Sequence, residues 1–461
     1  MTDHRPERPG SLSRDVGLTL SYYTGMIIVD TELARREEAG EPVRVALVGG
    51  GYVARCIALQ FVTAGRGMRL VAIANRTAAG AVAAYAGAGV DDVVHVSTAG
   101  ELEQAIAAGR PTVTDDATVV CAAGPVDVVI EATGHVEFGT QVCFDAIAHG
   151  KHVVMMGAEV DASVGPILKT YADRAGVVFT YTDGDEPGVA MNLHRFADGI
   201  GYRPVLMGQL KGFLDRYRNP DTQAVLAEKL GQNPAMLAAF ADGSKLALEA
   251  TIMGNATGFV PQVRGMRGHA CDDVKDLLSL FTPDDFVDGG LVDYALGAAP
   301  HTGAFILCHN DHAEKRRQMA YFKMGDGPLY LFYQPYHMPP WQIADSVARA
   351  ALFSDATITP RGAPVCDTIA CAKRDLRAGE RLDGMGGFAA YGVVERAEIC
   401  RREDVLPIAV SLDCTLRRDI AKDAPITYAD VQLPNDRLVD RLRAEQTERF
   451  ASADAITARA E

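Results

Sequence analysis

The chain is poor in the features that build membrane proteins and disulfide-stapled secreted domains. Its 461 residues contain no run near the roughly eighteen uninterrupted apolar residues that span a bilayer. Residues Met1 to Asp15 are polar and mixed in charge, so they lack the apolar core of a signal peptide. The nine Cys residues are thinly spread and none forms a Cys-x-x-Cys pair, which argues against metal knuckles and a disulfide framework. We therefore expect a soluble, cytoplasmic protein with reduced thiols.

Basic residues are also scarce relative to acidic ones. The chain has 45 Lys and Arg against 60 Asp and Glu, which gives a net charge of -15. Duplex nucleic acid and anionic membranes both need a basic footprint on their partner, so neither is expected here. A phosphorylated small molecule, which needs only a local basic pocket, stays compatible with this charge. The 48% hydrophobic fraction excludes a disordered chain, and the length suits about three domains.

Short apolar runs alternate with helical patterns in the first part of the chain. The runs are apolar throughout, which is typical of parallel strands buried on both faces. We predict strands at Val43–Val48, Arg69–Ala74, Thr118–Ala122, Val126–Ala132, His152–Met156 and Val177–Thr182. We predict helices at Tyr22–Ala39, Tyr52–Ala64, Ala78–Gly87 and Gln141–His149. The fold class is therefore α/β, with a Rossmann-type parallel sheet.

The character of the chain changes twice after this sheet. Helix-like blocks at 222–241 and 244–256, followed by apolar runs at 303–308 and 328–333, predict a mixed α+β catalytic domain. From about residue 360, Gly, Pro and short strands dominate, and a basic-basic-Asp-aliphatic step occurs at both Lys373–Leu376 and Arg417–Ile420. The predicted divisions are 1–40 (tail and helix), 41–183 (dinucleotide-binding domain), 184–355 (catalytic and dimerisation domain), 356–436 (small β-rich domain) and 437–461 (helical tail).

A glycine-rich turn lies between the first predicted strand of the sheet and the helix after it. In Gly49-x-Gly51-x-x-Ala54, the first glycine suits a tight turn, the second lets backbone approach a pyrophosphate, and Ala54 allows close helix packing. The helix N-terminus then supplies free N–H groups to the phosphates. A purely structural turn is the alternative. The placement favours a dinucleotide site, with contacts from Gly49, Gly51, Tyr52 and Val53.

The end of the second strand bears on the choice of cofactor. NAD-binding domains usually place an acidic residue there to hold the ribose 2′-hydroxyl, whereas this chain has Asn75-Arg76-Thr77. An arginine can pair with a 2′-phosphate, although the same sequence would also fit a solvated loop arginine that binds no ligand. We therefore expect NADP(H) rather than NAD(H). Ala132, Thr133 and Gly134 end a later strand at the same edge. Small residues there can lie beside the nicotinamide ribose, or they can form an ordinary turn.

Two polar stretches stand out in the second domain. The first, Asp183–Gly188, could bind substrate hydroxyls or a weakly held Mg²⁺ or Mn²⁺ through Asp183, Asp185 or Glu186, or could be a turn. The second, Lys211–Asn219, has three cations, one acid and a phenol. Lys211, Arg216 and Arg218 are close enough in sequence to converge on an anionic or hydroxyl-rich substrate, or the stretch could be a solvated loop. We expect no structural metal site. The predicted catalytic residues are Lys211, Asp215, Arg216 and Glu186, with Lys211 as the proton donor.

Three further residue pairs favour structural roles. Lys245 and Glu249 suit an ion pair on the face of a predicted helix. His309 and His312 suit a loop, since no third metal ligand is near. Cys366 and Cys371 have no basic neighbour that would activate a thiol.

Several of these segments together resemble a known family. Val43–Ala54 and Asp127–Gly134 look like the NAD(P)-binding domain of homoserine dehydrogenases. More specific segments are Gly150–Val154, Thr182–Val189, Lys211–Arg218, Phe240–Lys245, Gly325–Tyr330 and Ala372–Gly379. In combination they resemble the homoserine-dehydrogenase-like oxidoreductases that carry a C-terminal SAF domain, a group that includes the deoxyxylulose-phosphate reductoisomerase-like (DRL) enzymes. The resemblance covers about residues 20 to 445.

The resemblance implies a Rossmann domain, a mixed α+β catalytic domain and a small SAF-like domain, together with NADP(H) and a homodimer or a higher homo-oligomer. One segment departs from the pattern. Homoserine dehydrogenases have Ala-Asn-Lys, with a catalytic lysine, where this chain has Met156-Gly157-Ala158-Glu159. Lys211 is the expected replacement for that lysine.

The leading hypothesis is an NADP(H)-dependent oxidoreductase that transfers hydride to or from a small polyoxygenated carbonyl or alcohol, such as a sugar or sugar phosphate. It would act as a DRL-like reductase or reductoisomerase. One alternative is an amino-acid pathway dehydrogenase of the homoserine dehydrogenase type. Another is a sensor or assembly subunit that binds the dinucleotide without turnover.

Overall fold

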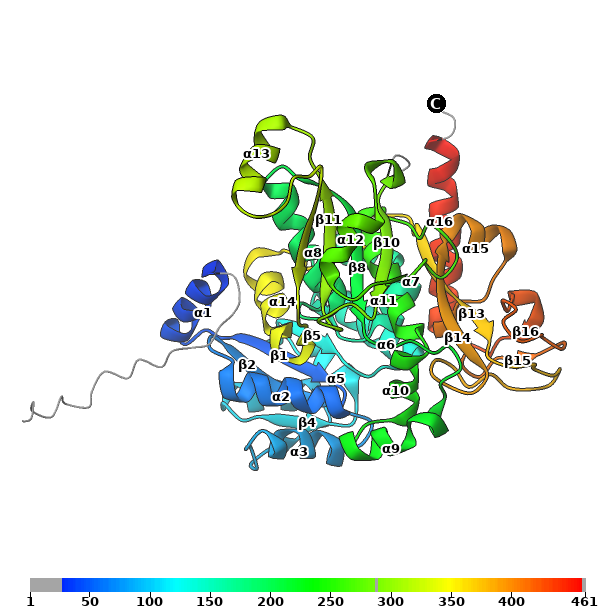
Figure 1. Ribbon diagram of the computed structural model, residues 1–461. Helices are drawn as coiled ribbons and strands as arrows, with labels where there is room; N and C mark the ends of the chain where they lie inside the picture. The colour runs from blue at the N-terminus through cyan, green and yellow to red at the C-terminus, as the bar shows by residue number, and fades with distance from the viewer. Residues whose placement is uncertain (1–26, 287–288, 458–461) are drawn as a thin grey trace, which may run out of the picture.

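A seven-stranded parallel sheet forms the first part of the protein (Figure 1). The computed structural model describes residues 27–286 and 289–457. Every pairing in this sheet is parallel. The strands, in spatial order, are β3 (Val94–His95), β4 (Thr112–Thr114), β2 (Met68–Ala74), β1 (Val43–Val48), β5 (Val128–Glu131), β6 (His152–Met155) and β7 (Phe179–Tyr181). This sheet confirms the predicted α/β class and its Rossmann-type order.

Helices cover both faces of this sheet, as its uniformly apolar strands require. One apolar core lies under α1 (Ile27–Ala39), α2 (Tyr52–Ala64), α3 (Ala78–Gly87) and α14 (Pro339–Phe353). The opposite face packs against α4 (Ala99–Ala107), α5 (Ala117–Ala122), α6 (Val136–Ala148) and α7 (Ala158–Ala175). The predicted helix Tyr22–Ala39 begins outside the described residues. The long helix α7 was not predicted.

The segment Thr118–Ala122 is a helix, so its prediction as a strand is wrong. Its Thr and Val residues favour a strand by intrinsic propensity. However, the Asp116 side chain accepts hydrogen bonds from both the backbone N–H of Thr118 (2.8 Å) and its hydroxyl (2.7 Å). Asp116 is therefore an N-cap, and a local capping interaction outweighs the β-branched composition of the short helix α5.

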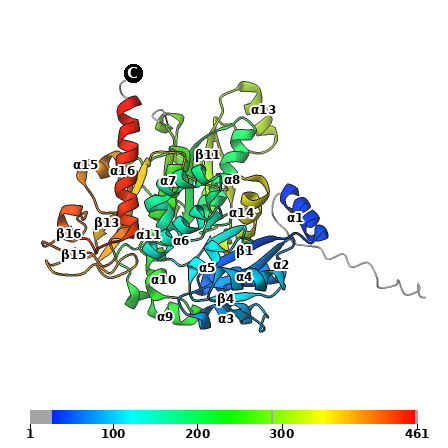
Figure 2. The ribbon, with the colours of Figure 1, turned by 180° about the vertical axis from the view of Figure 1, so that it is seen from behind.

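A five-stranded mixed sheet forms the second layer (Figure 2). Its spatial order is β12 (Leu329–Gln334), β11 (Ala304–His309), β8 (Arg203–Lys211), β10 (Leu291–Leu296) and β9 (His269–Ala270). β10 runs parallel to β8, whereas β11 runs antiparallel to both β8 and β12. The helices α8 (Glu186–Gly199) and α11 (Ser244–Thr257) pack against this sheet, and α12 (Leu277–Leu280) and α13 (Ala313–Tyr321) follow in its connections.

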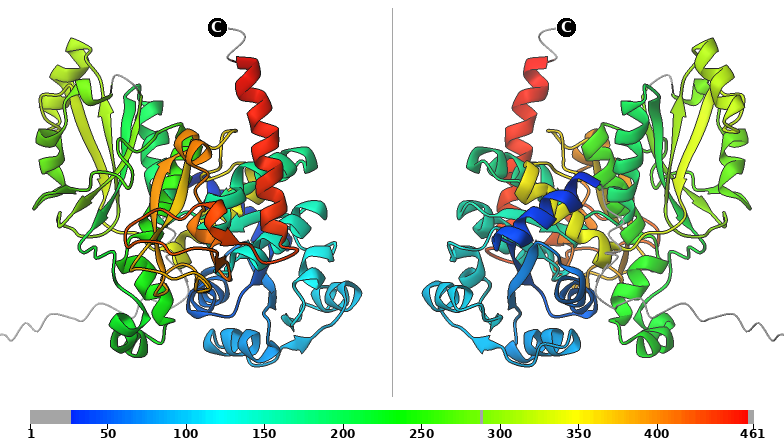
Figure 3. Two further views of the ribbon diagram at one scale, coloured as in Figure 1. Left: turned by 90° about the vertical axis from the view of Figure 1, so that its right-hand side faces the viewer. Right: turned by 90° about the vertical axis from the view of Figure 1, so that its left-hand side faces the viewer.

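The block 222–241 is two helices rather than the one expected. α9 (Pro220–Leu230) ends at Gly231, whose φ of +62° suits a left-handed helix cap. α10 (Pro234–Ala241) then begins after Asn233, whose side chain accepts a hydrogen bond from the backbone N–H of Ala235. Figure 3 shows this helix pair below the rest of the second layer.

The C-terminal region is a small module of short antiparallel pairs. β13 (Cys366–Ala372) pairs with β14 (Ala390–Arg396), and β15 (Thr415–Leu416) pairs with β16 (Val431–Gln432). A short helix, α15 (Ala397–Glu403), follows β14. The last helix, α16 (Leu438–Thr457), runs back along α6 and α7. No helix in the described ranges is long and apolar enough to cross a membrane.

The repeated basic-basic-Asp-aliphatic step corresponds to a paired arrangement within this module. Leu376 and Ile420, one from each copy, donate backbone hydrogen bonds to each other. The acids of the two steps act in the same way, because Asp375 accepts the backbone N–H of Lys422 while Asp419 accepts that of Ala378. The two copies are therefore related by a local pseudo-twofold axis.

Candidate active site and dinucleotide site

The two loops expected at a dinucleotide meet at the carboxyl edge of the parallel sheet. The chain passes from β1 to β2 on one side, and later returns to β5 on the other side of β1. Such a reversal of strand order leaves a crevice outside the strand ends, where ligands of this fold class bind. Gly49 follows β1 and has φ +133°, and a Cβ there would lie 2.6 Å from the carbonyl oxygen of Ala132. A side chain at Gly49 is therefore excluded.

The start of α2 is open toward this crevice. Gly51 is the N-cap of α2, and a Cβ built on Gly51 would meet no atom within 4 Å. Ala54 is fully buried against the sheet, as close helix packing requires, whereas the side chain of Tyr52 is exposed and that of Val53 is half-buried. Open space in front of free helix N–H groups fits a pyrophosphate.

Asn75 braces the neighbouring loop. Its side-chain amide donates to the carbonyl oxygen of Thr77 (2.9 Å), and a Cβ on Gly50 would lie 2.8 Å from its Cγ. Asn75 thus fills the space between the loops that follow β1 and β2. Arg76 is exposed at the same edge, where a 2′-phosphate would lie.

The loop after β5 is ordered by a buried carboxylate. Thr133 donates to Glu131 through its backbone N–H (2.8 Å) and through its hydroxyl. Gly134 has φ +65°, and the Cε of Met236 lies 3.4 Å from where a Cβ of Gly134 would stand. The loop expected at the nicotinamide ribose is therefore flanked by α10.

Lys211 and Glu186, both predicted as catalytic, form a close ion pair in the second layer. Lys211 ends β8, Glu186 begins α8, and their charged atoms Nζ and Oε1 are 2.5 Å apart. Burial alone would raise the pKa of Glu186, but Lys211 and His337 outweigh it and lower that pKa to about 2. Burial likewise opposes the charge on Lys211, but Glu186 and Glu249 outweigh it and raise the pKa of its ammonium. The lysine is therefore held as a cation.

Lys245 and Glu249 belong to the same cluster, so their assignment as a surface ion pair is wrong. All fourteen residues of α11 are buried, and Glu249 Oε2 lies 3.7 Å from Lys211 Nζ. The carboxylates of Glu159, Asp185, Glu249 and Glu186 overcome the effect of burial and raise the pKa of Lys245. Their burial comes from tertiary packing, because α11 also carries Ser, Thr and Asn side chains and has no uniformly apolar pattern.

Two acids that the sequence reasoning missed face the sheet edge at Gly157. A Cβ on Gly157 would lie 2.9 Å from Oε2 of Glu159 and 3.2 Å from Oε2 of Glu131. Both side chains are buried, and neither of these oxygens has a hydrogen-bond partner within the described residues. Burial is the main cause that raises the pKa of Glu131 to about 7. The cluster therefore extends from β8 to the strand ends of the Rossmann-type sheet.

The candidate metal ligands separate into two groups. Asp185, Glu186 and His337 offer ligand atoms within 4.8 Å of one another. Asp183 instead accepts hydrogen bonds from the amide of Asn192 (3.0 Å) and from the backbone N–H of Gly184 (2.7 Å). Asp183 therefore anchors its turn rather than joining this group.

The expected convergence of Lys211, Arg216 and Arg218 is not what the structure shows. Each cation contacts a different group: Lys211 pairs with Glu186, Arg218 pairs with Asp215 (3.1 Å), and Arg216 lies over the ring of Tyr391. Lys211 is held by β8, whereas the arginines lie in the loop beyond it, where aromatic side chains bind them individually. Asp215 and Arg216 therefore lie outside the Lys211 cluster.

The remaining pairs have structural environments. His309 ends β11, and His312 caps α13 by accepting the backbone N–H of Lys315. Burial raises the pKa of Cys371 to about 12 and that of Cys366 further still. Neither thiol is an activated nucleophile.

Residues 184–341 match the family model described as oxidoreductase DRL, catalytic domain. The match covers about a third of the chain and includes Glu186, Lys211, Lys245, Glu249 and His337. It confirms the predicted enzyme class and agrees with the DRL part of the sequence resemblance. No protein of curated function matches the chain.

Solved structures resemble the chain at low similarity. A UDP-N-acetylglucosamine 3-dehydrogenase from Acidithiobacillus ferrooxidans is 13% identical, with 69% of this chain and 92% of that chain covered and a TM-score of 0.37. The biliverdin reductase from Synechocystis sp. PCC 6803, solved with biliverdin and NADP+, is 17% identical, with 64% and 80% covered and a TM-score of 0.31. GenD2 from gentamicin A biosynthesis, solved with NAD, is 15% identical, with 68% and 87% covered and a TM-score of 0.35. From the family match, the protein is an oxidoreductase.

Proposed function

We propose that the protein is an NADP(H)-dependent oxidoreductase acting on a small, hydroxyl-rich carbonyl or alcohol. The observation that carries this proposal is the Lys211–Glu186 pair, 2.5 Å apart and continuous with the buried acids at the edge of the Rossmann-type sheet. When bound at that edge, the dinucleotide supplies or accepts the hydride.

Lys211 is the proposed donor to the substrate oxygen. Its side chain is 21% exposed while that of Glu186 is only 2% exposed, so the ammonium can reach a ligand without leaving its counterion. A cation beside the carbonyl oxygen stabilises the negative charge that develops there as hydride is added to the carbon. Lys245 supplies a second positive charge within the same acidic cluster.

The charges around Lys211 favour hydroxyl groups over an anion. Glu159, Asp185, Glu186 and Glu249 outnumber the two lysines of the cluster. The acids that stay ionised already match the two lysine charges, so no positive charge is left over for a phosphate, whereas carboxyl groups exchange hydrogen bonds with hydroxyl groups. We therefore propose a sugar or polyol rather than a sugar phosphate. The same acids favour one second candidate, an amino alcohol such as homoserine, because they would hold its ammonium group.

A divalent cation fits this cluster poorly. Of the three grouped ligands, Glu186 already contacts the Lys211 ammonium at 2.5 Å, and a metal ion beside it would be repelled. We therefore propose a reduction that proceeds without a metal ion. Activity that disappears on exhaustive chelation and returns with Mg²⁺ or Mn²⁺ would overturn this part of the proposal.

The substrate test is a two-way screen of the purified protein. With NADPH it is offered sugar aldehydes and ketones, and with NADP⁺ it is offered polyols, homoserine and their phosphates. We expect turnover of an uncharged, hydroxyl-rich compound. Turnover of homoserine alone would select the second candidate, and a preference for phosphates would contradict the charge argument.

The cofactor test uses Arg76. A charge-assisted pair with the 2′-phosphate contributes about 1.5–3 kcal/mol, so Arg76→Ala should weaken NADPH binding by roughly 10- to 100-fold and leave NADH unchanged. Arg69→Ala is the matched control, because Arg69 is an exposed arginine near the opposite end of β2. Equal affinities of the wild type for NADPH and NADH would contradict the preference. We further propose that the C-terminal module is SAF-like and that the protein is a homodimer, which light scattering would test.

A further inference from the structure

Helix α10 connects the dinucleotide edge to the C-terminal module. On one side, Met236 lies against Gly134, in the loop that follows β5. On the other side, Gly386 of the C-terminal module packs on the backbone of α10, so closely that a Cβ at Gly386 would collide with the carbonyl oxygen of Ala235. Figures 1 and 3 show α10 between these two regions. The helix is therefore held between the proposed cofactor loop and the module.

A buried lysine of the module fixes the C-terminal end of this helix. Asp242 is the C-cap of α10, and Lys373 Nζ lies 2.8 Å from its Oδ2. The same ammonium donates hydrogen bonds to the carbonyl oxygens of Arg218 (2.5 Å) and Gly387 (2.7 Å). One side chain of the module thus joins α10, the loop after Lys211 and the glycine turn that packs on α10.

Further contacts hold the loop between β8 and α9 on the module. The Tyr217 hydroxyl lies 3.0 Å from Oδ2 of Asp423, and Arg216 lies over the ring of Tyr391. The backbone N–H of Asp215 donates to the carbonyl oxygen of Ala241 at the end of α10 (2.9 Å). The loop and the helix therefore form one unit, and the module holds it.

We propose that the C-terminal module positions α10 as a wall of the dinucleotide site, with Met236 in contact with the bound dinucleotide and with Lys373 and Asp242 as the positioning pair. This inference rests on the proposed dinucleotide site. It gives the module a defined role in cofactor affinity. In this arrangement Met236 supplies the contact, and the Lys373–Asp242 pair acts through the helix without touching the ligand.

The test compares the NADPH affinity of full-length variants, which is measured by titration with the fluorescence of NADPH as the signal. Lys373→Met combined with Asp242→Asn removes the ion pair and leaves no buried charge, and Asn keeps the acceptor for the backbone N–H of Ser244. We expect this variant to bind NADPH about tenfold more weakly, with kcat at saturating NADPH much less affected. Met236→Ala should weaken binding about as much, because it removes most of one apolar side-chain contact, and Met236→Leu should stay near wild type.

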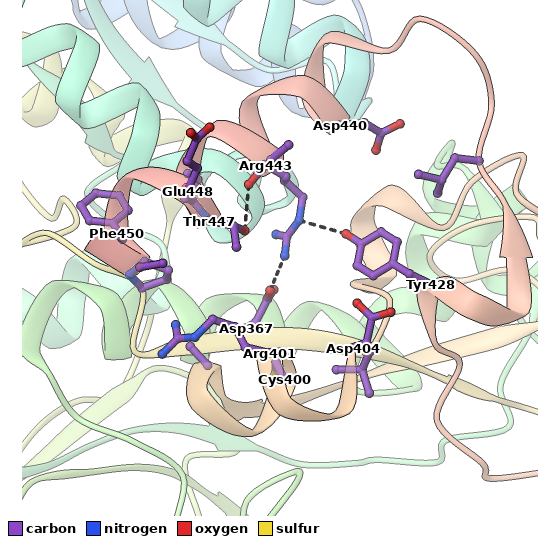
Figure 4. A pocket seen from close by; sticks show the side chains of 17 residues that line it. Asp367, Cys400, Arg401, Asp404, Tyr428, Asp440, Arg443, Thr447, Glu448 and Phe450 are labelled. Carbon is purple, nitrogen blue, oxygen red and sulfur yellow. Dashed lines mark hydrogen bonds and ion pairs between the residues drawn. The ribbon is translucent and has the colours of Figure 1, made fainter. Parts of the chain in front are cut away.

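The control is a half-buried ion pair that joins the module to α16. Arg443 on α16 and Asp367 on β13 lie 2.6 Å apart beside a cavity (Figure 4), and no residue of α10 lines that cavity. Asp367 also accepts a neighbouring backbone N–H, so Arg443→Met with Asp367→Asn perturbs the module in the same way. We expect the control to lower the unfolding temperature and to keep the affinity for NADPH.

Each outcome is decisive. Equal loss of NADPH affinity in both double variants would show a general loss of stability and would overturn the inference. Wild-type affinity in folded Lys373→Met/Asp242→Asn and in Met236→Ala would also overturn it. If the double variant does not fold, Met236→Ala alone decides. If the wild type binds neither NADPH nor NADH, the proposed function fails first, and the inference fails with it.

Discussion

Two lysines of this protein, Lys373 and Lys211, contact carboxylates in opposite ways. The side chain of Lys373 is 4% exposed, and its three contacts are Asp242 and two backbone carbonyl oxygens. The side chain of Lys211 is 21% exposed, and its contacts are Glu186 and, more distantly, Glu249. An ammonium has three N–H donors, so Lys373 has none left for a ligand, whereas Lys211 has a donor and an open side.

The difference separates a structural lysine, Lys373, from Lys211, the lysine that we propose as catalytic. Lys373 is matched by a single carboxylate, so its charge is balanced locally. Lys211 lies among more acids than lysines, and burial together with Glu186 raises the pKa of Glu249 well above its ordinary value. A surplus of buried acids weakens folding, and a protein retains such a cluster when a bound substrate uses it.

The largest expected effect comes from replacing Lys211. Lys211→Met should lower kcat/KM by about 10²–10⁴-fold, because the group that stabilises the substrate oxygen is lost. NADPH affinity should stay the same, because Lys211 lies in the second layer and the proposed dinucleotide site lies at the strand ends of the first. Steady-state kinetics and a fluorescence titration measure the two quantities.

Two variants control for the loss of positive charge. Lys211→Arg keeps a cation beside Glu186 and should fold normally with most activity lost, because a larger, planar guanidinium cannot place an N–H where the compact ammonium meets the substrate oxygen. Lys169→Met removes a lysine from an exposed pair with Asp173 and should leave turnover unchanged. Full activity in Lys211→Met would show that the comparison assigns the functional role to the wrong lysine.

Replacing Lys373 should lower stability instead of activity. The single variant Lys373→Met leaves Asp242 buried without its counterion, which costs about 3–5 kcal/mol of unfolding free energy. Urea denaturation of the full-length protein measures this loss. Restoring part of it with the second change, Asp242→Asn, would confirm that the buried charge is the cause. A loss below about 1 kcal/mol would mean that Lys373 is no more structural than a surface lysine.

Local patterns in the sequence predicted the parallel sheet and the glycine turn, and they singled out Lys211 and Glu186 separately. The uniformly apolar runs at β1 and β2 indicate parallel strands, and Lys211 and Glu186 each stand in a polar stretch beside apolar segments. Sequence reasoning did not predict that β8 would bring these two stretches together, 25 residues apart.

Contacts between distant segments account for most of the errors. Glu131 lies in a predicted strand, Glu159 lies in no predicted element, and only the packing of α7 beside β5 places both at Gly157. Lys245 looked like a surface residue because a single helix does not reveal that β13, β14, α7 and α8 surround it. Burial of this kind depends on tertiary packing, which residue spacing does not encode.

Asp161 is a buried acid that, unlike Asp242 and Glu186, has no lysine as a partner. Asp161 on α7 is fully buried, neither of its carboxylate oxygens has a hydrogen-bond partner among the described residues, and burial raises its pKa to about 7. The folded protein therefore keeps a proton on Asp161 that the unfolded chain loses near pH 4. Stability should fall as the pH rises from about 4 to 7 and then level off.

The variant Asp161→Asn tests the direction in which stability changes with pH. The variant removes the ionisation, so it should gain about 1–3 kcal/mol over the wild type at pH 8 and little or nothing at pH 4. Glu186 should behave in the opposite way, because its pKa of about 2 contributes stability above pH 4.5 that is lost as the pH falls toward 2. Urea melts at pH 4, 6 and 8 measure the Asp161 trend, and urea melts between pH 2 and 5 measure the Glu186 trend. A stability difference between Asp161→Asn and the wild type that does not change with pH would contradict the role of burial.

The smallest effect belongs to Arg417, the counterpart of Lys373 in the internal repeat. The two residues occupy equivalent places beside the paired strands at Leu376 and Ile420, yet Arg417 is exposed while Lys373 is buried. The repeat therefore keeps one backbone framework, and only the copy that faces α10 uses its basic residue as an anchor. Arg417→Met should change the unfolding free energy by no more than about 0.5 kcal/mol and should leave NADPH affinity unchanged. The same substitution thus tests two positions that share a backbone environment and differ in what the side chain contacts. If Arg417→Met were as damaging as Lys373→Met, the repeat itself would need the basic residue, and contact with α10 would no longer explain why Lys373 is buried.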